Sequence, residues 1–182
     1  MLIAIVIGLG ITRILSGFSA LLEHRLEIKP DWLTIIWAVN VLGYQLIYWW
    51  IVVNNWRSLS EWSFSRFGLL FLYSVLLFFC ASLILPSQLE SGMDMKARFE
   101  TIRKPFYILW LLVICSDLAD SFLKGSDYVL AELGWAYVGL MSYALLLPVL
   151  GLFISDRRFH FAAAISFFIV YASWTLSSFA TI

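Results

Sequence analysis

One cation and two acids lie inside hydrophobic runs of this sequence. Arg13 lies in the apolar stretch LGITRILSG, and Asp117 and Asp120 lie in another apolar run far along the chain. A charge at the centre of a membrane-spanning helix costs roughly 2.5 to 3.5 kcal/mol on insertion scales, so such residues face protein or water and often mark an ion path. We therefore predict that Arg13 points into the protein and that the two aspartates compensate its positive charge.

The spacing of these residues predicts a shared polar core. Asp117 and Asp120 are three residues apart, which places both on one helical face. Asn40 and Tyr44 share a face of an earlier apolar run, with Asn40 near the middle of the membrane. One acid would neutralise Arg13 while the other titrates or holds a cation. The alternative is a buried ion pair that only fixes the helix register. The predicted core consists of Arg13, Asp117, Asp120, Asn40 and Tyr44.

A second group of ionisable residues lies at the ends of apolar runs and includes both histidines of the chain. We expect these residues to form a solvated rim at one end of the protein. The alternative is a site that processes lipid headgroups or senses pH, because histidine titrates near neutral pH. The rim residues are Glu23, His24, Arg25, Asp156, Arg157, Arg158 and His160.

Motifs of known catalytic sites are missing from the sequence. It contains no glycine-rich phosphate loop, no HExxH and no GxSxG. Cys80 and Cys115 lie in apolar runs without metal-ligand spacing and are interpreted as small hydrophobic residues. The formal net charge is zero, which argues against a nucleic-acid partner. We therefore expect no catalytic residues, no metal, no cofactor and no enzymatic activity.

The composition indicates the class of structure that must position these residues. The chain is 62% hydrophobic and 13% charged, with a mean hydropathy of +0.90. A soluble domain carries about 25% charged residues, so lipid must be the main solvent here. We predict an all-α, polytopic membrane protein that forms a single domain over residues 1–182, with the lipid bilayer as its main partner.

A helix needs about 20 mostly apolar residues to cross a bilayer, and six segments qualify. We expect Pro105 to begin the fourth span, Pro148 to kink the fifth, and MDMKARFETIRK to form a short interfacial helix with its basic residues toward headgroups and water. The predicted spans are Leu2 to Leu22, Trp32 to Val53, Phe67 to Leu85, Pro105 to Phe122, Tyr128 to Ile154 and Phe159 to Ala180.

Lysine and arginine are distributed unevenly between the loops. The first, third and fifth loops carry eight, whereas the second and fourth carry three. The positive-inside rule therefore predicts cytosolic odd loops and two external termini. No basic residue precedes the first apolar run, so we expect this run to be a permanent helix rather than a signal peptide.

Short matches between the two halves suggest an inverted duplication of residues 1–88 and 94–182. WAVNVL at Trp37 corresponds to WAYVGL at Trp135, and CASLIL at Cys80 to YASWTL at Tyr171. Inverted repeats of this kind are common in transporters, whose sites lie near the membrane midplane.

The stretch LGITRILSG, followed by a basic loop and a tryptophan-rich second span, resembles small bacterial multi-span membrane proteins. The resemblance covers about a third of the chain and implies a bacterial inner-membrane location but no activity. Our first functional hypothesis is a small transporter or channel-like protein that moves a proton, an ion or a small polar solute. The alternatives are a non-transporting subunit that binds a membrane-protein partner and a lipid-acting enzyme. We also expect a homodimer.

Overall fold

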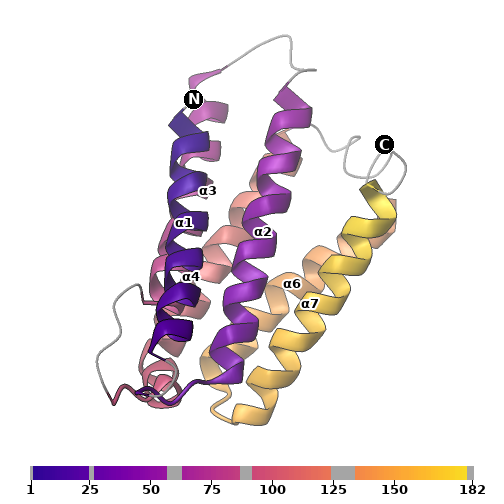
Figure 1. Ribbon diagram of the computed structural model, residues 1–182. Coiled ribbons are helices and arrows are strands. Elements are labelled where there is room, and N and C mark those ends of the chain that lie inside the picture. Colours follow the sequence, from indigo (N-terminus) through magenta and orange to yellow (C-terminus); the bar gives the residue numbers. More distant parts are fainter. Residues whose placement is uncertain (1, 25–26, 57–62, 87–91, 124–133, 180–182) are drawn as a thin grey trace.

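Six helices make up the structure, a computed structural model that describes residues 2–24, 27–56, 63–86, 92–123 and 134–179 (Figure 1). Each is long and apolar enough to cross a membrane, which confirms the predicted all-α class and the six spans. The helices are α1 (Leu2–Glu23), α2 (Trp32–Trp56), α3 (Phe64–Ile84), α4 (Met95–Leu123), α6 (Gly134–Phe153) and α7 (Arg157–Phe179).

Helices α2 and α4 form the middle of the bundle. Helix α2 contacts α1, α3, α4 and α7, and α4 contacts α3 and α6. Helices α1 and α3 pack against each other on one side, and α6 and α7 on the other (Figure 1). The polar face predicted for α2 is therefore directed into the protein, and Trp37, Asn40 and Tyr44 are all buried.

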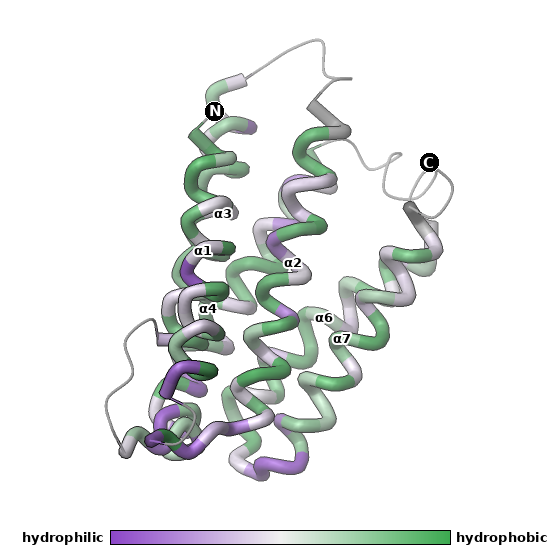
Figure 2. The backbone as a smooth tube through the Cα atoms, viewed as in Figure 1, coloured by the Kyte–Doolittle hydropathy of each residue, from purple (hydrophilic) through white to green (hydrophobic). Residues whose placement is uncertain are grey.

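The outer surface of the bundle is apolar along the helices. Large side chains such as Leu9, Leu46, Leu72, Ile108 and Phe168 are each about half exposed, because no neighbouring helix covers them. Hydrophilic residues gather instead at one end of the bundle (Figure 2). A hydrophobic surface of this kind is stable only in contact with lipid, so the protein is a multi-pass membrane protein.

The hydrophilic end, which we call the odd-loop end, consists of residues 27–31, 92–94 and 154–156. Backbone hydrogen bonds join the first of these segments to the second and to the start of α4, from Lys29 N to Met93 O and from Met95 N to Lys29 O. Gly92, whose positive φ of 83° suits glycine, donates its N–H to Glu27 O at 2.8 Å. The opposite end, which holds the beginning of α1 and the end of α7, is called the terminal end (Figure 1).

Helix α1 attaches to the bundle through two glycines. A Cβ atom on Gly10 would lie 2.3 Å from Nε2 of Gln45, and one on Gly17 would lie 2.6 Å from Cγ of Leu85. These close approaches show that this face of α1 packs against protein, which small residues allow in membrane helices. Ser16 of the same helix is exposed.

The third loop differs from the prediction. Instead of a short interfacial helix followed by a span that begins at Pro105, one continuous helix runs from Met95 to Leu123 with Pro105 inside it. The Asp94 carboxylate begins this helix by accepting the N–H groups of Lys96 and Ala97. Met95 and Phe99 are fully buried, and their burial offsets the hydrogen bond that Pro105 cannot donate.

The two predicted repeat halves pack differently. Helix α1 lies directly against α3, whereas α4 and α7, their counterparts in the second half, meet through large side chains such as Trp110 and Phe167. The duplication stays a prediction, and this difference does not support it. The structure is that of one chain, so the homodimer stays a prediction as well.

Candidate functional site

Asp117 lies inside the bundle among tyrosine hydroxyls. Its Oδ1 accepts a hydrogen bond from Tyr73 of α3 at 3.0 Å, and its Oδ2 accepts one from Tyr137 of α6 at 3.3 Å. The Tyr137 hydroxyl also lies 2.6 Å from Oγ of Ser121, one turn along α4. Three helices therefore hold one carboxylate at a level about 9 Å from the end of α4.

Tyr44, a predicted core residue, belongs to this cluster. Its hydroxyl lies 3.0 Å from that of Tyr73, and its ring stacks on Tyr171 of α7 with centroids 4.7 Å apart. Tyr44 and Tyr73 are each about 1% exposed. The structure thus brings Tyr44 and Asp117 together through Tyr73, a residue that the sequence analysis did not single out.

The remaining predicted core residues lie elsewhere. Asn40 donates from Nδ2 to the Ala164 carbonyl at 2.9 Å, so it joins α2 to α7. Asp120 is half-buried one turn beyond Asp117, and Arg13 is half-buried on α1. Helix α3 contacts both α1 and α4. The pairing of Arg13 with either aspartate stays a prediction.

A second polar cluster lies at the odd-loop end, around Arg103. Its guanidinium donates to the Gly151 carbonyl at 3.1 Å and also to the Ile154 carbonyl, where α6 ends. The same group lies 3.3 Å from Nε2 of His160 and 3.4 Å from Oγ of Ser155. Arg103 is 7% exposed, although we predicted that the basic residues of this stretch face water. Arg103 is buried because the last four carbonyls of a helix lack a partner within the helix, and a guanidinium can donate hydrogen bonds to several of them.

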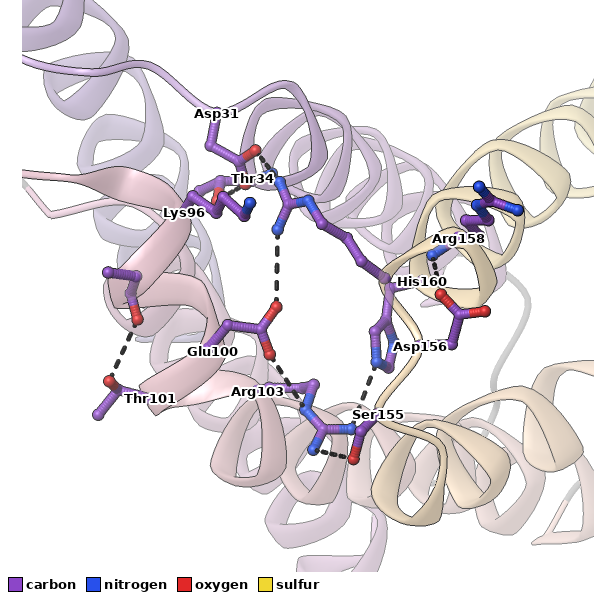
Figure 3. Close-up of polar contacts among 12 residues, drawn as sticks. Asp31, Thr34, Lys96, Glu100, Thr101, Arg103, Ser155, Asp156, Arg158 and His160 are labelled. Atoms are coloured by element: carbon purple, nitrogen blue, oxygen red, sulfur yellow. Dashed lines mark hydrogen bonds and ion pairs between the residues drawn. The ribbon is translucent and has the colours of Figure 1, made fainter.

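Arg157 ties three helices together beside this cluster. It forms an ion pair with Asp31 at the start of α2, and its NH1 lies 3.6 Å from Glu100 of α4. Glu100 is also paired with Nε of Arg103 at 3.8 Å. Asp31 in turn caps α2 by accepting hydrogen bonds from the backbone N and the hydroxyl of Thr34. Figure 3 shows Asp31, Glu100, Arg103 and His160 converging at this end.

The predicted solvated rim needs a correction at His160. This histidine is fully buried, with its Nδ1 2.9 Å from the Tyr107 hydroxyl. Arg103 has only donor N–H groups, so Nε2 of His160 accepts and Nδ1 carries the proton. Glu23, Asp156 and Arg158 are exposed as expected, His24 and Arg157 are half-exposed, and Arg25 lies outside the described residues.

A packed aromatic column lies between the two clusters. Tyr44 contacts Trp110 at 5.2 Å between centroids, Trp110 contacts Trp37 at 5.8 Å, and Trp37 contacts Tyr107 at 5.6 Å. Phe106 and Phe167 fill the sides of this column. The column thus runs without a break in ring contacts from the Asp117 cluster to His160.

Sequence reasoning missed the residues that complete both clusters. Tyr73, Tyr107 and Tyr137 lie in apolar runs and read there as ordinary core residues. Asp31 did carry a signal, because an aspartate three residues before Thr34 at the start of an apolar run is typical of a helix cap. No signal in the sequence indicated the partners of Arg103, because they lie about 50 residues away along the chain.

These features define the class of protein, a multi-pass α-helical membrane protein with two internal polar clusters. The described residues contain no group of three or more histidine, cysteine, aspartate or glutamate side chains arranged to hold a metal ion. No family model, curated protein or solved structure compared with the chain matches it.

Proposed function

We propose that this protein is a small transporter or channel-like protein that moves a proton or another small cation, with Asp117 as the binding group. The supporting observation is the position of its carboxylate, held at a membrane-spanning level by hydroxyls from α3 and α6. Ionisable residues at such positions commonly mark ion pathways. Carboxylate and hydroxyl oxygens are ligands for hard cations and also carry protons.

The same proposal places the protein in the bacterial inner membrane with the odd-loop end in the cytosol. The basic residues of the odd loops support this orientation by the positive-inside rule. Several exposed tryptophans near helix ends, among them Trp32 and Trp135, suit the two membrane interfaces. Asp117 then lies in the external half of the bundle. The proposed activity is transport without chemical conversion of the solute.

Flux measurements on proteoliposomes test this proposal. Purified protein is reconstituted, a membrane potential is imposed, and the fluxes of H⁺, Na⁺ and K⁺ are followed with ion-selective dyes. We expect at least one flux above that of empty liposomes, lost in D117N and retained in D156N. Asp156 is a matched control because it is an exposed carboxylate at the opposite end of the bundle. No flux, or equal flux in D117N and the wild type, overturns the proposal.

The second candidate function is a subunit that binds another membrane protein, here a second copy of this chain, and one groove favours it. A groove of 170 Å³ lies between α6 and α7, lined by residues that include Leu146, Leu150, Phe159 and Ala162. Small residues beside such a groove let another helix approach closely. Native mass spectrometry tests whether a second copy occupies it. A doubled mass that returns to a single chain in A162W, but not in L72W on the lipid-facing side of α3, supports this candidate.

A further inference from the structure

Glu100 lies between two arginines at the odd-loop end at distances too long for hydrogen bonds. Its Oε1 is 3.6 Å from Nη1 of Arg157, and its Oε2 is 3.8 Å from Nε of Arg103 (Figure 3). Charge-assisted hydrogen bonds between such groups are about 2.7 to 2.9 Å long. Both arginine nitrogens are buried and have no hydrogen-bond partner among the described residues. Two arginine N–H groups therefore flank one carboxylate that does not satisfy them.

Other contacts, which do not involve Glu100, hold the two guanidinium groups in place. Arg103 donates hydrogen bonds to the carbonyls of Gly151 and Ile154 at the end of α6. Arg157 forms its ion pair with Asp31 at the start of α2. Both arginines therefore keep their positions when Glu100 moves, and groups fixed in this way bind a ligand without the cost of ordering long side chains.

Glu100 is the movable member of this group. Its side chain is 42% exposed, whereas that of Arg103 is 9% exposed. An ion pair with an exposed partner contributes little to stability, so rotation of the Glu100 carboxylate into water costs little. The position of this carboxylate also shows that an anionic group can lie between the two arginines and still be reached from solvent.

We propose that Arg103 and Arg157 form a binding site for a phosphate group, and that Glu100 covers this site in the structure. The planar fork of arginine matches the oxygens of a phosphate, which has more acceptor oxygens than a carboxylate. Asp31 balances the charge of Arg157, and His160 is neutral because its Nε2 accepts from Arg103. When Glu100 turns away, the site therefore keeps an unbalanced positive charge that attracts the anion.

The phosphate group at this site has two sources, the headgroup of an anionic lipid and a soluble phosphate. Arg157 is the first residue of α7, at the hydrophilic end of the bundle, and basic pockets between helices at this level of a membrane bind lipid headgroups (Figure 2). Either ligand would join α4 to α7 and, through the other contacts of the two arginines, to α2 and α6. Binding therefore stabilises the folded protein, whether or not the protein transports an ion.

Thermal unfolding in dodecyl maltoside, an uncharged detergent without phosphate, tests this site. One arm adds sodium phosphate, with sodium chloride at matched ionic strength as the control. The other arm adds phosphatidic acid, whose headgroup is a phosphate monoester, with phosphatidylcholine as the control. We expect at least one ligand at saturation to raise the melting temperature by about 3 °C or more above its control.

Two pairs of variants separate this site from general surface charge. R157Q and R158Q remove the same charge from neighbouring residues, but Arg158 is exposed whereas Arg157 contacts Glu100. We expect R157Q to lose the shift and R158Q to keep it. E100Q removes the competing carboxylate, so it should bind phosphate about two- to fivefold more tightly than the wild type. E23Q removes another exposed carboxylate at the same end and should bind phosphate as the wild type does.

Each outcome supports or overturns the site. No shift of the wild type in either arm, equal shifts in R157Q and R158Q, or equal affinities of E100Q and E23Q overturn it. A shift with phosphatidic acid alone identifies the ligand as a lipid headgroup, and a shift with sodium phosphate alone identifies it as a soluble phosphate. Circular dichroism checks folding, and the gain of affinity in E100Q decides the question if R157Q does not fold. Absence of ion flux overturns the proposed function and leaves this site intact.

Discussion

Oδ1 of Asp117 lies 3.0 Å from the hydroxyl of Tyr73, so an acid of α4 accepts a hydrogen bond from a tyrosine of α3. The contact matters because a half-buried carboxylate is stabilised by donors to its oxygens. Tyr73 and Tyr137 supply them from two different helices. Asp117 consequently links α3, α4 and α6. A change of its protonation would alter its hydrogen bonds to Tyr73 of α3 and Tyr137 of α6.

Replacement of Asp117 should separate its structural role from its charge. D117A removes two hydrogen bonds, although the Tyr73 and Tyr137 hydroxyls keep Tyr44 and Ser121 as partners. At about 0.5 to 1.5 kcal/mol for each bond, we expect a loss of about 1 to 3 kcal/mol in the free energy of unfolding. D117N keeps an acceptor oxygen and should lose less. Unfolding of the detergent-solubilised protein, followed by circular dichroism, measures both values. Equal stability of D117A and the wild type would contradict the geometry described above.

Removal of the Arg103 side chain should be among the most damaging single changes at the odd-loop end. R103M leaves two carbonyls of the α6 terminus without their donor, and a buried acceptor that loses its partner costs about 1 to 3 kcal/mol. The adjacent Lys104 is exposed, so K104M should change stability by less than about 0.5 kcal/mol. Thermal unfolding of the two variants in the same detergent gives the comparison. Similar melting temperatures for both would show that the Arg103 contacts contribute little.

The ion pair between Asp31 and Arg157 can be measured by a double-mutant cycle. D31N keeps an oxygen that caps α2 but loses the charge, whereas R157Q removes the other partner. We expect a coupling energy of about 0.5 to 3 kcal/mol, because the two residues are in contact and Asp31 is buried. A cycle of D31N with R158Q, whose arginine is exposed, should be additive. Additivity in both cycles would rule out a contribution from the pair.

Two glycines of α1 offer a matched test of helix packing. G10A places a methyl group where Gln45 now lies, so the Gln45 amide must shift and its 3.1 Å bond to the Leu77 carbonyl weakens. We expect a destabilisation of about 1 to 3 kcal/mol. At Gly8 nothing lies within 4 Å of an added Cβ atom, and G8A should be neutral or stabilising. The difference in unfolding free energy between G10A and G8A isolates the packing term. A destabilised G8A would point to backbone effects instead.

Much of the bundle follows from local pattern. The lengths of the apolar runs predict six helices, and periodicity places Asn40 and Tyr44 on one face of α2, which is buried. The continuous helix α4 was not predicted, because Pro105 is a typical helix start and the burial of Met95 and Phe99 depends on neighbouring helices. In this segment, packing against neighbouring helices therefore overrode the local tendency of proline to begin a helix.

The sequence by itself determined the solvent of this protein, its helical class and the positions of its intramembrane acids, because hydrophobicity and helical period are properties of neighbouring residues. The tertiary structure decided which groups those acids and cations meet. Asp117 meets tyrosines, and Arg103 and His160 are buried together although their types and positions suggested solvent. Tyrosine has an apolar ring and a polar hydroxyl, so its position in a sequence does not show whether the ring packs in the core or the hydroxyl forms a hydrogen bond. Contacts between residues about 50 positions apart depend on the packing of whole helices.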